Sequence, residues 1–161
     1  MRASGRLLLA LLLLGVVGCD HTSKQLAETH LASRRVVTLV PDVLDLRLVR
    51  NTDTAFTLMG SLVDEPTRWL VVLGLQGLAT LAMGWVLLRR WQFARAFERA
   101  AGVLVLGGAL GNLTERAVRG YVVDFIHLHH WPVFNVADIA LCVGTPLLVL
   151  AVGSARSPAS E

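Results

Sequence analysis

The sequence is poor in charged residues and in cysteine. Only 17% of its 161 residues are charged and 54% are hydrophobic, whereas an average soluble domain carries about a quarter charged residues. This shortage of charge excludes an ordinary soluble domain and predicts a membrane protein. The two cysteines, Cys19 and Cys142, both lie in apolar stretches, which gives neither a disulfide framework nor a zinc-ligand spacing.

Several catalytic and binding signatures are also missing. The chain has no His-Glu-x-x-His motif, and His127, His129 and His130 are distant in sequence from the other histidines, so we predict no metal site and no cofactor. No serine has a Gly-x-Ser-x-Gly setting, which argues against a serine protease. The arginines form no stripe with aromatic residues, so we predict no nucleic-acid partner.

Long apolar segments are abundant instead. About 20 helical residues cross a hydrocarbon core of about 30 Å. We therefore predict one domain over residues 1–161, an all-α membrane protein with a small β element and a tail at residues 154–161 that frays. The third segment is short, and Gly107 and Gly111 have the small-xxx-small spacing of closely packed helices. The predicted transmembrane helices span residues 7–28, 69–88, 96–115 and 133–153.

The first apolar segment also has a competing interpretation. Arg2 and Arg6, an apolar run and the sequence before Cys19 are typical of a bacterial secretory signal with a lipoprotein cleavage box. Against cleavage, three further apolar segments follow, and Asp20 and Lys24 have the spacing of one helix face. We favour an uncleaved first helix, and a cleaved or lipidated N-terminus stays the alternative.

The long first connection is predicted to form a β-cradle over residues 33–60. Residues 36–40 are a β-branched apolar run, Pro41 and Asp42 are a turn signal, and leucines alternate with other residues over 44–49. This pattern predicts a small hairpin or curved sheet on the membrane surface. Packing on the helix ends and binding of an acyl substrate are both open interpretations.

The arginines predict an orientation in the membrane. Four arginines within residues 89–99, together with Arg2 and Arg6, place these ends in the cytoplasm. Five arginines in the long first connection oppose the same rule. We predict that residues 31–68 and 114–132 lie on the outer side.

Two carboxylates at membrane depth carry the predicted chemistry. Asp138 lies at the start of the last apolar segment, and Asp124 precedes it by a short connection; a carboxylate at this depth indicates a functional site. Two adjacent carboxylates share one proton and serve as general base and general acid in peptide hydrolysis. Alternatively, Asp124 pairs with Arg116 or Arg119, and Asp138 is held by a helix N-terminus.

The polar residues fall in five short blocks: Asp20-x-x-x-Lys24, Asn51-Thr52-Asp53-Thr54-Ala55-Phe56, Gly107-Gly108-Ala109-Leu110-Gly111-Asn112-Leu113-Thr114-Glu115-Arg116, Val123-Asp124-Phe125 and Trp131-Pro132-Val133-Phe134-Asn135-Val136-Ala137-Asp138. In this order the blocks resemble the successive signature blocks of the lipoprotein signal peptidase (signal peptidase II) family. The resemblance covers about residues 6–153.

The resemblance implies a bacterial inner-membrane aspartyl protease with four transmembrane helices, both termini in the cytoplasm, and an active site on the periplasmic side. It further implies an outer β-cradle and a short outer helix. The substrate would be a diacylglyceryl-modified prolipoprotein, cut before its lipidated cysteine, and membrane lipid and cyclic peptide antibiotics would be further partners. By motif position the catalytic pair is Asp124 and Asp138. The residues that would bind substrate or support the site are Asn51, Asn112, Arg116, Asn135, Asp20 and Lys24.

Two positions depart from the family pattern. Asp53 stands where glycine is usual, and Glu115 stands where aspartate is usual. We hypothesise a paralogue with altered affinity for substrate or for the antibiotics. A catalytically inactive paralogue that binds prolipoprotein or antibiotic, or a small membrane carrier, is the alternative from another functional class.

Overall fold

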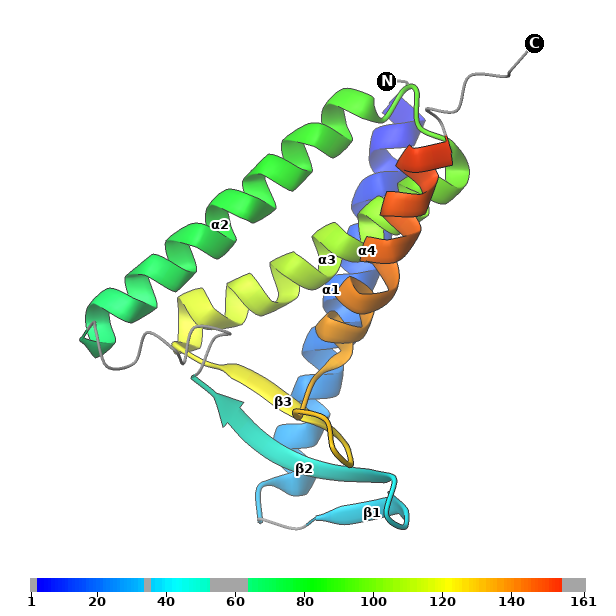
Figure 1. Cartoon of the computed structure of the whole chain (residues 1–161). Helices are drawn as coiled ribbons and strands as arrows, with labels where there is room; N and C mark the ends of the chain where they lie inside the picture. The colour runs from blue at the N-terminus through cyan, green and yellow to red at the C-terminus, as the bar shows by residue number, and fades with distance from the viewer. Residues whose placement is uncertain (1–2, 34–35, 53–63, 155–161) are drawn as a thin grey trace.

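The structure is a computed structural model that describes residues 3–33, 36–52 and 64–154. Figure 1 shows the helices extending from one end of the molecule, where both termini lie, with a small sheet at the other end. The predicted mostly helical fold with a small β element is confirmed. The elements are α1 (Ala3–Leu31), β1 (Val37–Val40), β2 (Leu44–Asn51), α2 (Glu65–Arg90), α3 (Ala96–Arg119), β3 (Val122–Leu128) and α4 (Val136–Ser154).

Each helix covers one of the four predicted apolar segments. Three of them are long and apolar enough to cross a membrane, over Leu7–Leu31, Trp69–Arg90 and Val136–Gly153. Helix α4 begins at Val136 rather than at residue 133, because the chain before it forms a bridge to β3 at Phe134. Cys19 lies within α1, whose N-terminal half packs through Leu9 on Trp91 and Val103.

Helix α3 is the centre of the bundle, and its glycines explain how closely the other helices approach it. A Cβ atom at Gly107 would lie 2.7 Å from Val16 of α1, and one at Gly108 would lie 2.5 Å from the carbonyl oxygen of Ala137 in α4. Backbone contact of this kind excludes any larger residue at Gly108. The expectation that the glycine-rich segment packs against a neighbour is confirmed, since α3 packs against α1, α2 and α4.

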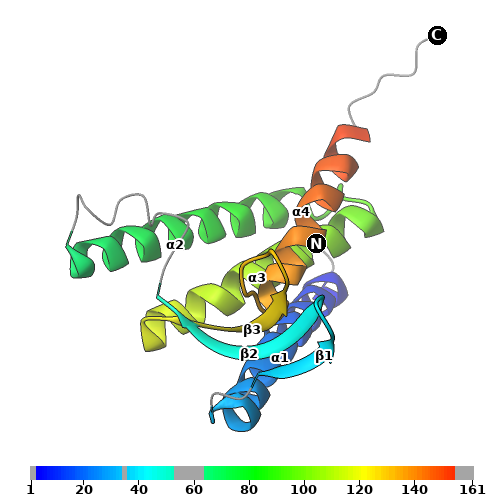
Figure 2. The ribbon, with the colours of Figure 1, turned by 60° about the horizontal axis from the view of Figure 1, so that its bottom comes forward.

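The sheet has the order β1-β2-β3, with both pairs antiparallel. The predicted hairpin corresponds to β1 and β2, and Asp42 in its turn has a φ of 58°, a left-handed conformation that aspartate tolerates. The third strand was missing from the prediction, which left Asp124 in a connection. Figure 2 shows the sheet curving across the ends of α1, α3 and α4.

The sheet is packed on the first helix through a small apolar cluster. Ala27, Leu31 and Phe125 are buried there. This contact supports the packing interpretation of the cradle. The partly buried residues around the cluster are Leu46, Leu48, Ile126 and Val136.

Helix α2 diverges from α1 and α4 (Figures 1 and 2), and of the described elements it contacts α3. Part of the predicted cradle, residues 53–60, lies outside the described residues, as do residues 155–161 of the predicted tail. The implied short outer helix has no counterpart among the seven described elements.

Candidate active site

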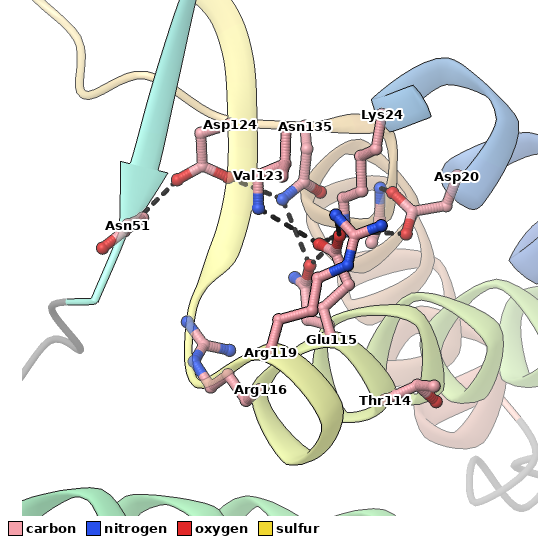
Figure 3. Close-up of polar contacts among 12 residues, drawn as sticks. Asp20, Lys24, Asn51, Thr114, Glu115, Arg116, Arg119, Val123, Asp124 and Asn135 are labelled. Carbon is pink, nitrogen blue, oxygen red and sulfur yellow. Dashed lines mark hydrogen bonds and ion pairs between the residues drawn. The ribbon is translucent and has the colours of Figure 1, made fainter. Parts of the chain in front are cut away.

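Asp124 lies in β3, where the strand pairs with β2 and covers the helix ends. Its carboxylate accepts two hydrogen bonds of 2.7 Å, one from the side-chain amide of Asn51 and one from that of Asn135. Figure 3 shows these two amides on opposite sides of the carboxylate. Because Asn51 ends β2 and pairs with Val122 of β3, the strand register places its amide beside Asp124.

The environment of Asp124 opposes ionisation. The residue is 2% exposed, and burial is the largest cause that raises the pKa of its carboxyl above the usual value. The negative charge of Asp138 raises this pKa further, whereas the hydrogen bonds from Asn51 and Asn135 lower it. A proton is therefore retained near Asp124 to a higher pH than on an aspartate in water.

Asp138 is held by a reciprocal cap at the start of α4. Its backbone N–H donates to the side-chain oxygen of Asn135 at 3.0 Å, and its carboxylate accepts from the backbone N–H of Asn135 at 3.1 Å. This is the capping-box arrangement, which satisfies two donors at a helix N-terminus. Asn135 thus binds both aspartates, since its side-chain N–H₂ group donates to Asp124.

Asn112 of α3 is part of the same hydrogen-bond network. Its side-chain N–H₂ group donates to Asp138 at 2.8 Å, and its oxygen accepts from Asn135 at 3.1 Å and from Lys24 at 3.0 Å. The ammonium of Lys24 cannot accept a hydrogen bond. It therefore fixes the oxygen of Asn112 toward itself and directs the N–H₂ group to Asp138.

A buried ion pair supports this arrangement. Asp20 and Lys24 are each 1% exposed, and the Lys24 ammonium lies 2.7 Å from the Asp20 carboxylate. The other oxygen of Asp20 accepts from the backbone N–H of Ala137 at 2.9 Å. Asp20 thus satisfies a second free donor at the α4 N-terminus and ties α1 to the helix that carries Asp138.

Glu115 connects the ion pair to the strand of Asp124. Its carboxylate lies 3.0 Å from the Lys24 ammonium and accepts from the backbone N–H of Val123 at 3.1 Å (Figure 3). The sequence had marked Glu115 only as a departure from the family pattern, and its role as a link between α3 and β3 was missed. Asp53, the other departure, lies outside the described residues.

The two arginines offered as alternative partners of Asp124 bind other residues. Arg116 donates to Gln76 of α2 at 3.0 Å, and Arg119 donates to Glu28 of α1 at 2.8 Å. Figure 3 shows Arg116 on α3 near β3 without a marked bond to Asp124. Arg116 therefore interacts with the two aspartates through its charge rather than through a hydrogen bond among the described residues. The other part of that alternative placed Asp138 at a helix N-terminus. Asp138 does bond there, to Asn135, and it also accepts a hydrogen bond from Asn112.

A second group of ionisable side chains lies at the other end of the sheet. Asp45, His127 and His129 each offer a ligand atom, and these atoms lie within 4.8 Å of one another. From the sequence these histidines were predicted to form no metal site, and their partner Asp45 was missed, because the strand pairing that joins them is not visible in a local motif. The prediction of no metal remains a prediction.

Comparisons with known proteins identify the family. A sequence model of the family described as signal peptidase (SPase) II matches residues 12–153. The lipoprotein signal peptidase of Syntrophotalea carbinolica is 39% identical over 140 residues, covering 84% of each chain. That of Pseudoalteromonas translucida is 36% identical and covers 93% of this chain and 89% of its own.

The fold agrees with these sequence matches. A solved structure described as a bacterial membrane enzyme at 2.3 Å resolution superposes with a TM-score of 0.75 and 27% identity, over 95% of this chain and 92% of its own. The match covers the helices and the sheet that together form the network of Asp124, Asn135 and Asp138. The chain therefore belongs to the signal peptidase II family.

Proposed function

We propose that the chain is an aspartyl endopeptidase that removes the signal peptide from diacylglyceryl-modified bacterial prolipoproteins, cutting before the lipidated cysteine. The relatives named lipoprotein signal peptidase support the substrate class. The observation that carries the mechanism is the double contact of Asn135, which donates to Asp124 at 2.7 Å and to Asp138 at 3.1 Å. One residue thereby links both carboxylates.

The reaction follows from a shared proton. Burial and the charge of Asp138 raise the pKa of Asp124, so the pair retains a proton to a higher pH than two isolated carboxylates do. The ionised carboxylate removes a proton from water as the water oxygen attacks the scissile carbonyl carbon. The protonated carboxylic acid gives its proton to the carbonyl oxygen. The tetrahedral intermediate then breaks its C–N bond, and the amine leaves with the proton taken from water.

Asn51 and Asn112 position the two carboxylates from opposite sides. Asn51 donates to one oxygen of Asp124, and Asn112 donates to one oxygen of Asp138. Each aspartate therefore has a fixed oxygen bound to an amide. Such fixed geometry reduces the reorganisation that hydrolysis requires.

The membrane arrangement is also part of the proposal. We infer that α3 forms a fourth span within a single peptidase domain, because it is surrounded by α1, α2 and α4 and needs a less apolar surface than they do. Figure 1 places both termini and the α2–α3 connection at the end opposite the sheet. The arginines Arg89, Arg90, Arg95 and Arg99 flank that connection, which favours cytoplasmic termini and a periplasmic site in the inner membrane.

A lipid-binding surface lies beside the sheet. An apolar pocket of about 340 Å³ opens between α1 and the sheet, and it suits an acyl chain of the substrate or of a membrane lipid. A cyclic peptide antibiotic would inhibit by occupying the space in front of the two aspartates. The pocket is lined by Ser23, Leu26, Ala27, His30, Leu31, Leu46 and Phe125.

The test is signal-peptide release from diacylglyceryl-modified prolipoprotein by purified protein in detergent. We expect the wild type to cleave, and Asp124→Asn and Asp138→Asn each to lower the rate by about 10²–10⁴-fold or more, the range for loss of a general acid or base. Asp42→Asn is the matched control, because Asp42 is an exposed carboxylate of the same sheet and asparagine tolerates its positive φ.

Cleavage that persists in either aspartate variant would exclude the dyad mechanism. If the wild type binds the prolipoprotein and leaves it intact, the chain is a binding paralogue, and the proposed activity is wrong. If the folded wild type neither binds nor cleaves the prolipoprotein, the result favours the carrier alternative.

A further inference from the structure

The far end of the sheet holds a compact group of one carboxylate and two imidazoles. Asp45 of β2 pairs in register with His127 of β3, and His129 follows in the turn after β3. The same oxygen of Asp45 lies 2.8 Å from Nε2 of His129 and 3.6 Å from Nδ1 of His127. Three ligand atoms from two strands and a turn therefore converge on one point.

These separations fit a small tetrahedral cation site. Zinc binds imidazole nitrogen and carboxylate oxygen at about 2.0–2.2 Å, so neighbouring ligand atoms in a tetrahedron lie about 3.3 Å apart. The separations of 2.8 and 3.6 Å bracket that value, and all three ligand atoms lie within 4.8 Å. A bound zinc ion would require the two imidazole nitrogens, which lie up to 4.8 Å apart, to close toward this value.

One ligand atom lacks a partner of its own. Nδ1 of His127 is buried and has no hydrogen bond among the described residues, although buried polar atoms are nearly always satisfied. The Asp45 oxygen lies 3.6 Å from this nitrogen, which is beyond hydrogen-bond distance. A bound cation would satisfy this nitrogen.

Asp45 is supported from the neighbouring strand. Thr38 of β1 pairs with it in register and hydrogen-bonds to its carboxylate, as second-layer partners do around metal ligands. The side chains of Asp45, His127 and His129 are 13%, 17% and 32% exposed, so an ion has access from solvent.

We propose that Asp45, His127 and His129 form a binding site for a divalent transition-metal cation, with zinc as the best-fitting ion. Two imidazoles disfavour magnesium and calcium, which prefer oxygen ligands. Water supplies the fourth ligand. The bound ion ties the β1–β2 hairpin to the chain between β3 and α4, at the opposite end of β3 from Asp124.

Zinc binding is measured on the full-length, tag-free protein in detergent after treatment with a chelator. Isothermal titration with zinc chloride is expected to give one equivalent bound per chain, and magnesium chloride is expected to give none. Zinc should also raise the melting temperature, because a ligand that binds the native state stabilises it.

Three variants locate the ion. Asp45→Asn and His127→Gln each remove one ligand with little change in side-chain volume, and each should weaken zinc binding by about tenfold or more. His130→Gln is the matched control, since His130 is exposed and adjacent but lies outside the group, and its zinc affinity should be that of the wild type. A His129→Cys variant replaces one zinc ligand by another and should retain binding.

The proposal is overturned if the wild type binds no zinc, in which case the group holds only a proton between Asp45 and His129. It is also overturned if Asp45→Asn and His127→Gln bind zinc as the wild type does, or if His130→Gln loses binding to the same extent. Gel filtration identifies any variant that unfolds, and the zinc affinities of the remaining variants then decide whether the ion binds at this group. Because the readout is zinc binding, its failure is distinct from failure of the proposed peptidase activity.

Discussion

The two ends of the sheet hold aspartates in opposite electrostatic environments. At one end Asp124 is buried and accepts hydrogen bonds from two neutral amides, and its pKa is raised chiefly by burial. At the other end Asp45 is more accessible and binds an imidazole, and its pKa is lowered chiefly by the hydrogen bond with His129. The two residues lie on adjacent strands of one sheet.

The difference shows that position in the network, and not residue type, determines the chemistry of each carboxylate. Among the described residues no cation bonds to Asp124, and Lys24 and Arg119 bind Glu115 instead. A neutral amide holds a carboxylate in place with less stabilisation of its charge than a cation provides. Asp124 is consequently suited to proton exchange, and Asp45 is suited to remain an anion.

Removal of the buried cation beneath the Asp124 end should have the largest effect. Lys24→Met keeps the length of the side chain but leaves Asp20 and Glu115 buried without their shared partner. Breaking a buried ion pair in this way costs about 3–5 kcal/mol of unfolding free energy. Equilibrium unfolding in mixed micelles measures the loss, and signal-peptide release should fall as well, because Asn112 loses the donor that orients it.

The matched change at the Asp45 end is His129→Gln. It breaks the contact between His129 and Asp45, which is more exposed than the Lys24 ion pair, so it should lower the free energy of unfolding much less. Equal losses in the two variants would remove the distinction between the ends of the sheet. A Lys24→Met protein as stable as the wild type would show that the buried charges do not hold the site together.

The sequence predicted the helices and the pair of aspartates because both leave local signals. Continuous apolar segments define membrane helices by length alone, and the small-xxx-small spacing of Gly107 and Gly111 indicates close packing. The spacing of Asn135 and Asp138 also carries the capping-box signal, which was not used. The alternating residues 44–49 and the turn at Pro41 and Asp42 were sufficient for the hairpin.

The missed features depend on contacts between distant segments. Strand β3 forms because β2 supplies partners for its backbone. The run Val122–Leu128 contains Asp124 and His127, which obscure an apolar pattern. The bonded partners also belong to different elements: Glu115 bonds to Val123, and Asp45 bonds to His129. Such pairings are determined by tertiary packing and leave no periodic signal in the sequence.

Shortening Glu115 tests how the Asp124 end is attached to α3. Glu115→Asp keeps the charge, but the carboxylate no longer reaches both Lys24 and the Val123 N–H. An unsatisfied buried donor costs about 1–3 kcal/mol, so we expect a loss of that size and faster hydrogen exchange at the Val123 amide. Glu115→Gln is the control for length, and it should keep the slow exchange. Unchanged exchange in Glu115→Asp would contradict a link between α3 and β3 through this side chain.

The smallest expected effect is an opposite dependence of stability on pH at the two ends. The raised pKa of Asp124 means that its ionised form destabilises the native state, and this penalty is relieved as the pH falls through the raised pKa. The lowered pKa of Asp45 means that its contribution to stability is present above the unfolded pKa of 3.8 and is lost as the pH falls through the folded pKa.

Melting temperatures of Asp124→Asn and Asp45→Asn are compared with that of the wild type in chelator-containing detergent between neutral and acidic pH. The differences from the wild type should therefore have opposite signs for the two variants. Asp45 is the more accessible of the two carboxylates, so solvent screening makes its effect the smaller one. Parallel curves for the two variants would show that the two carboxylates experience the same environment.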